Sequence, residues 1–166
     1  MLKKINIKKL LVETLKTLLI LFVLVNIISY IRAPKLPSEQ LPDIAGKTIE
    51  GTRVDIPENR PLLIHFWATW CPTCRMEAAN IDAVAKKFDV ITVAVKSGDD
   101  DAIKEYLRKN GYSFAVINDK KGVLARRFHI GVYPTTFIYD ADGKLLFSET
   151  GYTSSIGLYL RMLWAR

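Results

Sequence analysis

Cysteine and histidine are scarce in this sequence: its 166 residues include two of each. The cysteines, Cys71 and Cys74, are separated by only two residues. A disulfide between them would close a very short loop, which constrains the unfolded chain little. A tetrahedral zinc site needs four ligands, and only His65, before the pair, and His129, far beyond it, could join the two sulfurs. The scarcity therefore argues against a purely structural disulfide and against a metal site, and we expect no metal or other cofactor.

The sequence also lacks a basic patch of the kind that indicates nucleic-acid binding, although its net charge is +7. Residues 1–32 contain six basic residues and one acidic residue, whereas residues 33–166 contain 18 basic and 16 acidic residues. Most of the excess charge therefore lies at the N-terminus. The composition fits one globular domain that follows a more hydrophobic N-terminal segment.

That N-terminal segment has the pattern of a membrane anchor. Residues 1–9 include four lysines, and residues 10–31 carry only Glu13 and Lys16 as charges. At a rise of about 1.5 Å per residue, a helix over residues 10–31 would be about 33 Å long, enough to cross a bilayer core. Glu13 and Lys16 would lie one turn apart near the basic end, where they can pair or reach the interface. Residues 29–34 lack the small-residue site of a cleaved signal peptide, so a retained anchor is preferred over a signal peptide.

The charge pattern predicts the topology of this anchor. Lysines before the span place the N-terminus in the cytoplasm and the domain outside. We therefore expect a cytoplasmic tail at residues 1–9, a transmembrane anchor at 10–31, a proline-containing linker at 32–42 and a domain at 43–166. This arrangement describes a single-pass protein of the cell inner membrane whose domain is periplasmic.

The cysteine pair lies where a predicted strand ends and a predicted helix begins. Residues 61–68 form an apolar run typical of a buried strand. If Cys71 is the N-cap, Pro72 takes the first helical position and Cys74 the third. Free amide groups and the helix dipole then favour a negative sulfur at Cys71. Such a thiolate attacks a disulfide, and a thiol one turn away resolves the mixed disulfide. The spacing predicts Cys71 as nucleophile and Cys74 as the resolving thiol. Buried helix positions are expected at Cys74, Ala78, Ile81, Val84, Ala85 and Phe88.

The residues around the pair resemble a known family. The stretch Trp-Ala-Thr-Trp-Cys-Pro-Thr-Cys-Arg, with Glu77 two residues later, resembles the thioredoxin superfamily and its membrane-anchored, extracytoplasmic TlpA/DsbE-like branch. Residues 95–100 and 150–154 resemble the suppressor-of-copper-sensitivity D type of that branch, and the resemblance extends over residues 41–164. It implies an α/β fold, a thioredoxin-like three-layer sandwich with an N-terminal β-hairpin addition, preceded here by one transmembrane helix. It also implies a redox-active disulfide between Cys71 and Cys74.

Patterns elsewhere in the chain fit that fold. Turn glycines among β-formers predict an N-terminal hairpin or pair of short strands over residues 44–56. One aspartate among residues 99–101 should cap a helix over 102–109 that ends at Gly111, and helix capping fits these aspartates better than a calcium loop. Ser154 or Ser155 should cap a final helix that runs to Trp164. The remaining elements are predicted as strands at 90–95, 114–118, 136–139 and 144–148 and a short helix at 122–128.

Pro134 is the second landmark. A proline just before a strand cannot donate to the ladder, so it belongs at the first strand position or in a tight turn. The resemblance implies that Pro134 is cis, that its loop faces the cysteines, and that Tyr133 presents its backbone to a bound peptide. Trp70 is expected to shield the disulfide and to join this docking surface, whereas Trp67 is expected in the core.

Two positions depart from the family pattern, and a third matches it without an assigned role. Thioredoxins carry a buried aspartate where His65 stands, and that aspartate helps to move the proton of the resolving cysteine. His65 is a possible proton relay, although a strand histidine satisfied by a neighbouring backbone group is the preferred interpretation. Ala79 replaces a helix proline. Glu77 matches an acidic family position, but we expect it to face solvent or to form an ion pair and assign it no role.

These observations favour an enzyme: a membrane-tethered, extracytoplasmic thiol-disulfide oxidoreductase that exchanges disulfides with exported proteins, as a reductase or isomerase rather than an oxidase. It would receive electrons from a membrane partner. Three alternatives remain open. The cysteines could be soft copper(I) ligands of a metal-resistance protein, the enzyme could be a cytochrome c maturation reductase, or the domain could be a docking module without catalysis.

Overall fold

The computed structural model describes residues 7–32, 38–44 and 46–166. The chain divides into two compact units, residues 1–32 and residues 33–166. Most of the predicted tail at residues 1–9 lies outside the described residues, as do residues 33–37 of the predicted linker and Ala45 of the predicted hairpin.

The first unit contains one helix, α1 (Ile7–Arg32). Its described large apolar side chains, from Leu10 to Ile28, are 46–69% exposed. Glu13 and Lys16 form the predicted ion pair, at 3.3 Å. Among the residues that the structure describes, however, no helix is both long enough and apolar enough to cross a membrane. The transmembrane anchor predicted at residues 10–31 is therefore not confirmed.

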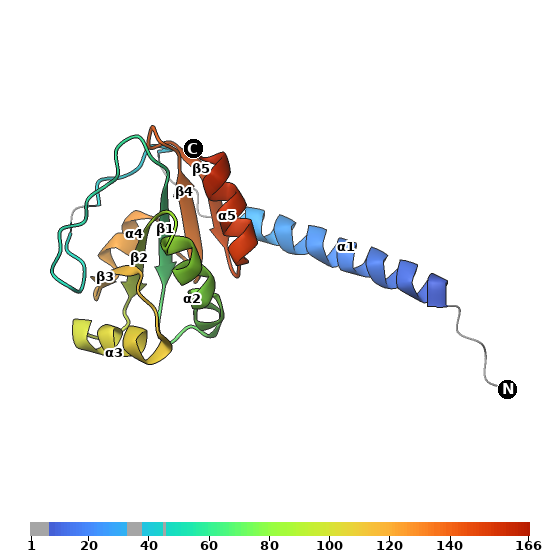
Figure 1. The fold of residues 1–166 in the computed structure, drawn as a ribbon, viewed down its shortest axis with the longest axis horizontal. Helices are drawn as coiled ribbons and strands as arrows, with labels where there is room; N and C mark the ends of the chain where they lie inside the picture. Colours follow the sequence, from blue (N-terminus) through green and yellow to red (C-terminus); the bar gives the residue numbers. More distant parts are fainter. Residues whose placement is uncertain (1–6, 33–37, 45) are drawn as a thin grey trace. The chain divides into compact units, whose positions relative to one another are not determined.

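The second unit is built on a five-stranded mixed sheet in the order β3-β2-β1-β4-β5 (Figure 1). The three strands β1, β2 and β3 are parallel, and β4 runs antiparallel to both β1 and β5. The strands are β1 (Leu62–Trp67), β2 (Asp89–Val95), β3 (Ala115–Asp119), β4 (Thr135–Tyr139) and β5 (Leu145–Thr150). The helices between and after them are α2 (Pro72–Ala85), α3 (Asp100–Asn110), α4 (Val123–Arg127) and α5 (Ser155–Trp164).

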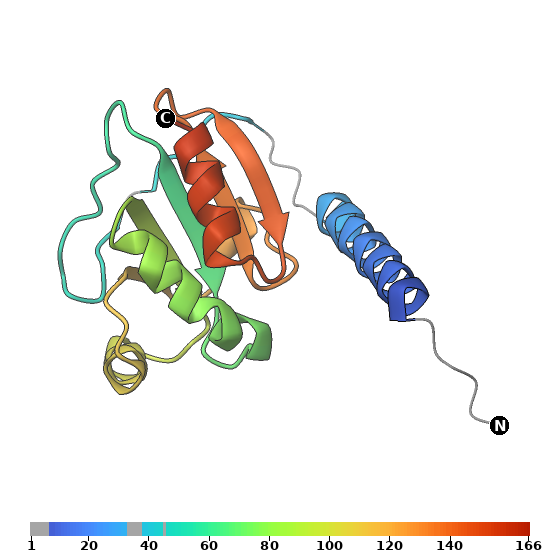
Figure 2. The ribbon, with the colours of Figure 1, turned by 45° about the vertical axis from the view of Figure 1, so that its right-hand side comes forward.

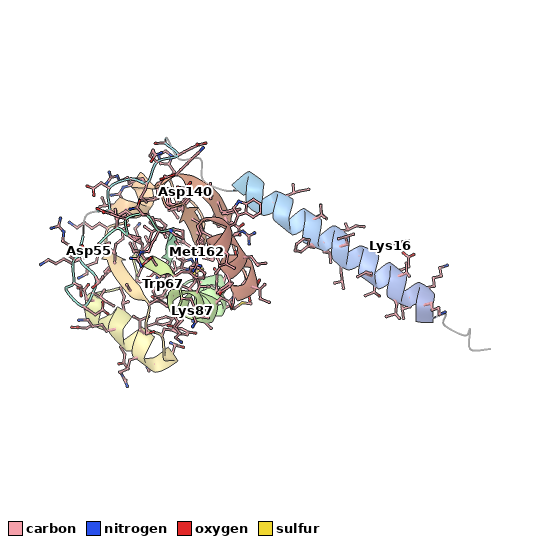
Figure 3. All side chains as sticks on the ribbon, turned by 45° about the horizontal axis from the view of Figure 1, so that its top comes forward. Lys16, Asp55, Trp67, Lys87, Asp140 and Met162 are labelled. Atoms are coloured by element: carbon pink, nitrogen blue, oxygen red, sulfur yellow. The ribbon has the colours of Figure 1, made fainter. Side chains whose placement is uncertain are left out.

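Helices cover both faces of the sheet, which confirms the predicted thioredoxin-like sandwich. Every residue of β1 is buried, and successive side chains of a strand point to opposite faces. Leu63 and Trp67 pack with one cluster that includes Met162 of α5, and the two helices α2 and α5 lie on the same side of the sheet (Figure 2). Figure 3 shows Trp67 and Met162 toward the middle of the domain. Ile64 and Phe66 pack with a second cluster that includes α4 residues.

Side-chain caps begin three of the helices at the predicted places. Cys71, Asp99 and Ser154 are the N-caps of α2, α3 and α5, and each accepts a hydrogen bond from the amide three residues later. Such bonds satisfy amides that have no partner within the helix. Gly111 ends α3 in the left-handed region, at φ 69°, where glycine is favoured.

The predicted N-terminal hairpin is reduced to a single bridge between Lys47 and Arg53. Backbone hydrogen bonds within the segment flank this bridge, and the turn also packs on the edge of the sheet. The amide of Ile49 donates to the Val116 carbonyl of β3 at 2.9 Å, and the Ile49 side chain is buried. The segment therefore covers an edge strand whose backbone groups would otherwise be free to pair with another chain.

The chain enters the domain beside the turn that joins β4 and β5. Gln40 forms a bridge with Lys144, and the Leu41 amide donates to the Gly143 carbonyl at 2.8 Å. This turn follows Tyr139, which pairs with Leu62 at the start of β1. Cys71 follows the other end of β1, so the entry and the cysteines lie at opposite ends of the sheet.

Candidate active site

Cys71 lies in the turn between β1 and α2. Its amide donates to the Ala68 carbonyl at 3.2 Å, and its extended backbone (φ −86°, ψ 117°) makes it the N-cap of α2. Its sulfur accepts a hydrogen bond from the Cys74 amide at 3.3 Å. Both cysteines are free thiols, with Cys71 6% and Cys74 1% exposed. Pro72 occupies the start of the helix, where its missing amide proton costs no hydrogen bond.

The loop before β4 faces Cys71. The peptide bond between Tyr133 and Pro134 is cis, as predicted. The Tyr133 carbonyl oxygen lies 3.7 Å from the Cys71 sulfur and accepts a hydrogen bond from the Cys71 thiol. The turn after β1 and the loop before β4 thus come together at the carboxyl end of β1.

Trp70 and Tyr133 form a partly exposed aromatic pair beside the nucleophile. Their rings meet edge to face, with centroids 5.6 Å apart, and the Trp70 indole donates to the Lys96 carbonyl at 3.2 Å. Trp70 remains 55% exposed. Trp67, by contrast, is buried and donates to the Thr92 hydroxyl. The two tryptophans therefore divide as predicted, one at the surface and one in the core.

The family model described as AhpC/TSA family matches residues 34–148. The chain belongs to the AhpC/TSA family. It is 38% identical over 165 residues to a thioredoxin-like protein of Haemophilus influenzae, covering 96% of this chain and 97% of the relative. It is 25% identical over 150 residues to sporulation thiol-disulfide oxidoreductase A of Bacillus subtilis, covering 83% of this chain and 91% of the relative.

A solved structure supports the same assignment. The secreted Mycobacterium tuberculosis disulfide oxidoreductase, described as homologous to E. coli DsbE, superposes with a TM-score of 0.63 at 26% identity. The match covers 73% of this chain and 95% of that structure. This AhpC/TSA protein is thus a thioredoxin-like enzyme, a thiol-disulfide oxidoreductase with the cysteine pair that the reaction requires.

His65 is a weakly basic residue of β1 in this AhpC/TSA protein. Its side chain is buried, and Nδ1 lies 2.9 Å from the Thr136 hydroxyl of β4. Burial lowers the pKa of His65 to about 3, so the ring is neutral near pH 7. A neutral ring with so low a pKa is a weak base, and the proton relay considered for His65 remains a prediction. The preferred interpretation, a satisfied strand histidine, fits better, although the partner is a side-chain hydroxyl and not a backbone group.

Glu77 is the residue that the sequence analysis misjudged. It was expected to face solvent or to form an ion pair, but it is fully buried. Oε1 accepts a hydrogen bond from the Thr153 amide at 3.0 Å, and Oε2 has no hydrogen-bond partner among the described residues. Burial raises the pKa of Glu77 to about 8. The Thr153 hydrogen bond lowers this pKa, and the negative charge of Glu149 raises it. The carboxyl group is therefore mostly protonated near neutral pH. Its signal was its position three residues after Cys74, on the buried stripe of the helix.

The two thiols have different surroundings. Burial raises the pKa of the Cys74 thiol well above its ordinary value, the hydrogen bond with Cys71 raises it further, and the charge of Glu77 adds to both. Cys74 therefore keeps its proton until a base removes it. Cys71 lies at the helix start beside the Tyr133 loop, where a substrate disulfide can reach it.

Within residues 7–32, 38–44 and 46–166, no three histidine, cysteine or acidic side chains are grouped as metal ligands.

The buried carboxyl group predicts a pH-dependent stability. Because the pKa of Glu77 rises from 4.5 to about 8 on folding, the native state keeps a proton that the unfolded chain releases between these values. This contribution lowers the free energy of unfolding as pH rises, by up to about 1.4 kcal/mol per pH unit. Glu77→Gln cannot ionise, so its unfolding free energy should exceed that of the wild type by a margin that grows from about pH 5 to about pH 8.

Denaturant unfolding of the reduced protein at several pH values measures this margin. Glu58→Gln, at an exposed position, is the matched control and should follow the wild-type pH dependence. Parallel pH profiles for Glu77→Gln and wild type would contradict the burial of an ionisable group at this position.

Proposed function

We propose that the protein exchanges disulfides with exported proteins outside the cytoplasm and works as a reductase or isomerase. The observation that carries this proposal is the position of Cys71. Its sulfur caps helix α2, meets the Tyr133 carbonyl and lies beside the exposed Trp70, while Cys74 is buried one helical turn behind it. This geometry presents one thiol to a protein substrate and reserves the other for the second step.

The reaction has two exchange steps. The Cys71 thiolate attacks one sulfur of a substrate disulfide, forming a bond between Cys71 and that sulfur, and the other substrate sulfur leaves as a thiolate. Cys74 then loses its proton and attacks the Cys71 sulfur. The Cys71–Cys74 disulfide forms, the substrate leaves as its second thiolate, and both substrate sulfurs take up protons. The substrate is reduced by two electrons and the cysteine pair is oxidised.

The ionised fraction of Glu77, which grows as the pH approaches 8, is our candidate for the proton acceptor of Cys74. It lies one turn from Cys74 on the same buried face of α2, and its charge contributes to the raised pKa of that thiol. A carboxyl group with a pKa of about 8 holds and releases protons in the range where thiols react. His65, with a pKa of about 3, is the weaker base of the two.

The surroundings of Cys74 favour the reducing direction. A strongly oxidising pair has a reduced form that is stabilised as a thiolate. Burial of Cys74 disfavours its thiolate, so this cysteine adds nothing to the stability of a charged reduced form. Re-reduction outside the cytoplasm then requires an electron-transfer partner in the membrane.

Substrate docking is proposed at Trp70 and at the loop of Tyr133 and Pro134. An extended peptide can pair with an exposed backbone segment as an added strand, and the loop precedes β4 directly. The exposed Trp70 ring offers an apolar surface beside this loop, in contact with the Tyr133 ring. Sequence-tolerant backbone pairing suits an enzyme that must accept several clients.

We assign the protein to the TlpA/DsbE-like branch and propose that residues 10–31 anchor it in the inner membrane, with residues 43–166 in the periplasm. Two features support this. Lysines precede an apolar stretch with only Glu13 and Lys16 as charges, and a solved relative at 26% identity is described as secreted. The anchor is a proposal that goes beyond the described helix.

The cysteine roles predict two different phenotypes. Cys71→Ser should reduce the rate of disulfide reduction in a model protein such as insulin to the uncatalysed background, because no nucleophile remains. Cys74→Ser should still attack but fail to resolve, so mixed disulfides with clients accumulate on non-reducing gels. Equal activity of Cys71→Ser and wild type would indicate a docking module and not an enzyme.

The proposed direction predicts a mostly reduced pair in cells. Acid-quenched cells are treated with a maleimide that adds mass to free thiols, and the labelled fraction of Cys71 and Cys74 is read from the gel shift. A pair that is oxidised at steady state, while its electron supply is active, contradicts the reductase or isomerase assignment and supports an oxidase.

The proposed anchor predicts that the full chain stays with membranes after an alkaline wash. Deletion of residues 1–31 should release the protein into the soluble fraction, because the remaining domain has its own core. Release of the full chain by the wash would contradict the transmembrane proposal, but it would not bear on the proposed thiol chemistry.

A further inference from the structure

Helix α5 carries apolar side chains on its outer face as well as on its inner face. Leu158, Met162 and Ala165 point inward and are buried. The outward positions follow helical spacing and are 39–79% exposed: Ile156, Tyr159, Leu160, Leu163 and Trp164. A helix that is apolar on all sides is normally covered, and contiguous exposed apolar surface marks an interaction site.

No free charge interrupts this outer face, which we call the α5 stripe. Arg161, the one charged residue within the helix, is part-buried and forms an ion pair with Glu149 at 2.6 Å. It also lies over the Phe147 ring, on the domain side of the helix. The stripe therefore offers apolar and aromatic groups without a carboxylate among them.

Basic side chains gather at the C-terminal end of the stripe. Arg60, Lys87 and Arg166 line one hollow of about 450 Å³ with Phe88 and Asp89. Arg166 lies over the Phe88 ring, which in turn packs against Tyr159 of the stripe. Asp89 pairs with Arg60, so the hollow keeps a positive excess. Apolar surface with tryptophan and tyrosine, next to lysine and arginine, is the composition of segments that lie on anionic membranes.

The stripe ends at the same end of the domain as the chain entry. Arg166 lines the hollow with Pro61 and Asp89, at the starts of β1 and β2. Gln40 and Leu41 enter beside the turn between β4 and β5, at that same end of the sheet. Figure 2 shows the C-terminus close to this turn. The basic end of the stripe and the chain entry thus lie at one end of the domain, whereas α5 begins at the other end, where the Gly151 amide donates to the Pro134 carbonyl.

We infer that the α5 stripe and its basic end dock the domain on an anionic bilayer surface. The inference rests on the proposed membrane attachment of the chain. The tryptophan and tyrosine rings lie at the interface, the leucine and isoleucine side chains reach the acyl region, and Lys87 and Arg166 lie at the level of the phosphates. A bilayer fits better than a second copy of the chain, because two copies would bring the basic ends or the uncharged stripes together without complementary charge.

The three tryptophans of the chain allow a direct test. The full chain is reconstituted into vesicles of phosphatidylglycerol and phosphatidylcholine with brominated acyl chains, which quench tryptophan only at close range. The difference between wild type and Trp164→Phe isolates the emission of Trp164. We expect most of this emission to be lost in brominated vesicles. The loss should be smaller when phosphatidylglycerol is omitted, because the basic end then has no anionic lipid to bind.

Leu160→Asp places a charge in the stripe at a side chain that is 60% exposed, and it should restore Trp164 emission. Val123→Asp, at a side chain on α4 that is 56% exposed, is the matched control and should leave the quenching unchanged. Circular dichroism of each variant establishes that it is folded. Insulin reduction by each variant shows whether the active site is intact.

The outcomes separate the proposals. If Trp164 emission is not quenched in brominated vesicles but is quenched by acrylamide in the aqueous phase, the docking inference is wrong. Trp164 that is shielded from both quenchers, increasingly so at higher protein concentration, means that another protein copy covers the stripe and also overturns it. If the full chain fails to float with vesicles, the anchor and the docking both fail, whereas insulin reduction decides the redox function independently.

Discussion

The hydrogen bond from the Cys74 amide to the Cys71 sulfur joins the fold to the chemistry. It exists because β1 ends in a tight turn and Pro72 starts the helix, so that Cys71 must serve as the N-cap. An ordinary cap is a hydroxyl or carboxylate oxygen. A sulfur in this place gains the Cys74 amide as its hydrogen-bond partner. The sheet holds the Tyr133 loop against this sulfur, and helix α2 holds the second cysteine one turn away.

The protonation states in the rest of the site follow from burial. Three titratable groups, His65, Cys74 and Glu77, lie on the same side of the sheet as α2, and burial favours the neutral form of each. Favouring the neutral form has different results for these groups. The histidine loses its basicity, whereas the carboxyl and thiol groups retain their protons. Only a group whose pKa stays within reach of neutrality can pass a proton, and Glu77 meets this requirement.

Much of the fold was predictable from local patterns. The apolar run before the cysteines gave β1 within one residue at each end, and Asp99 and Gly111 marked the ends of α3 because capping depends on neighbouring residues. The environment of Glu77 was not predictable, since the amide that binds it belongs to Thr153, far along the chain. The partner of His65 is similarly remote, on β4. The N-terminal turn pairs with β3 as well as with itself, which no local pattern reveals.

The burial of Cys74 has a consequence in time. Held one helical turn from Cys71, it attacks the mixed disulfide at a high effective concentration, yet its raised pKa keeps the reactive thiolate scarce. The lifetime of the mixed disulfide is set by these two opposing factors. Under the proposed function, a client bound during that interval would use its own free thiol to rearrange its disulfides before release. The burial of Cys74 would then influence how often a client is reduced and how often it is isomerised.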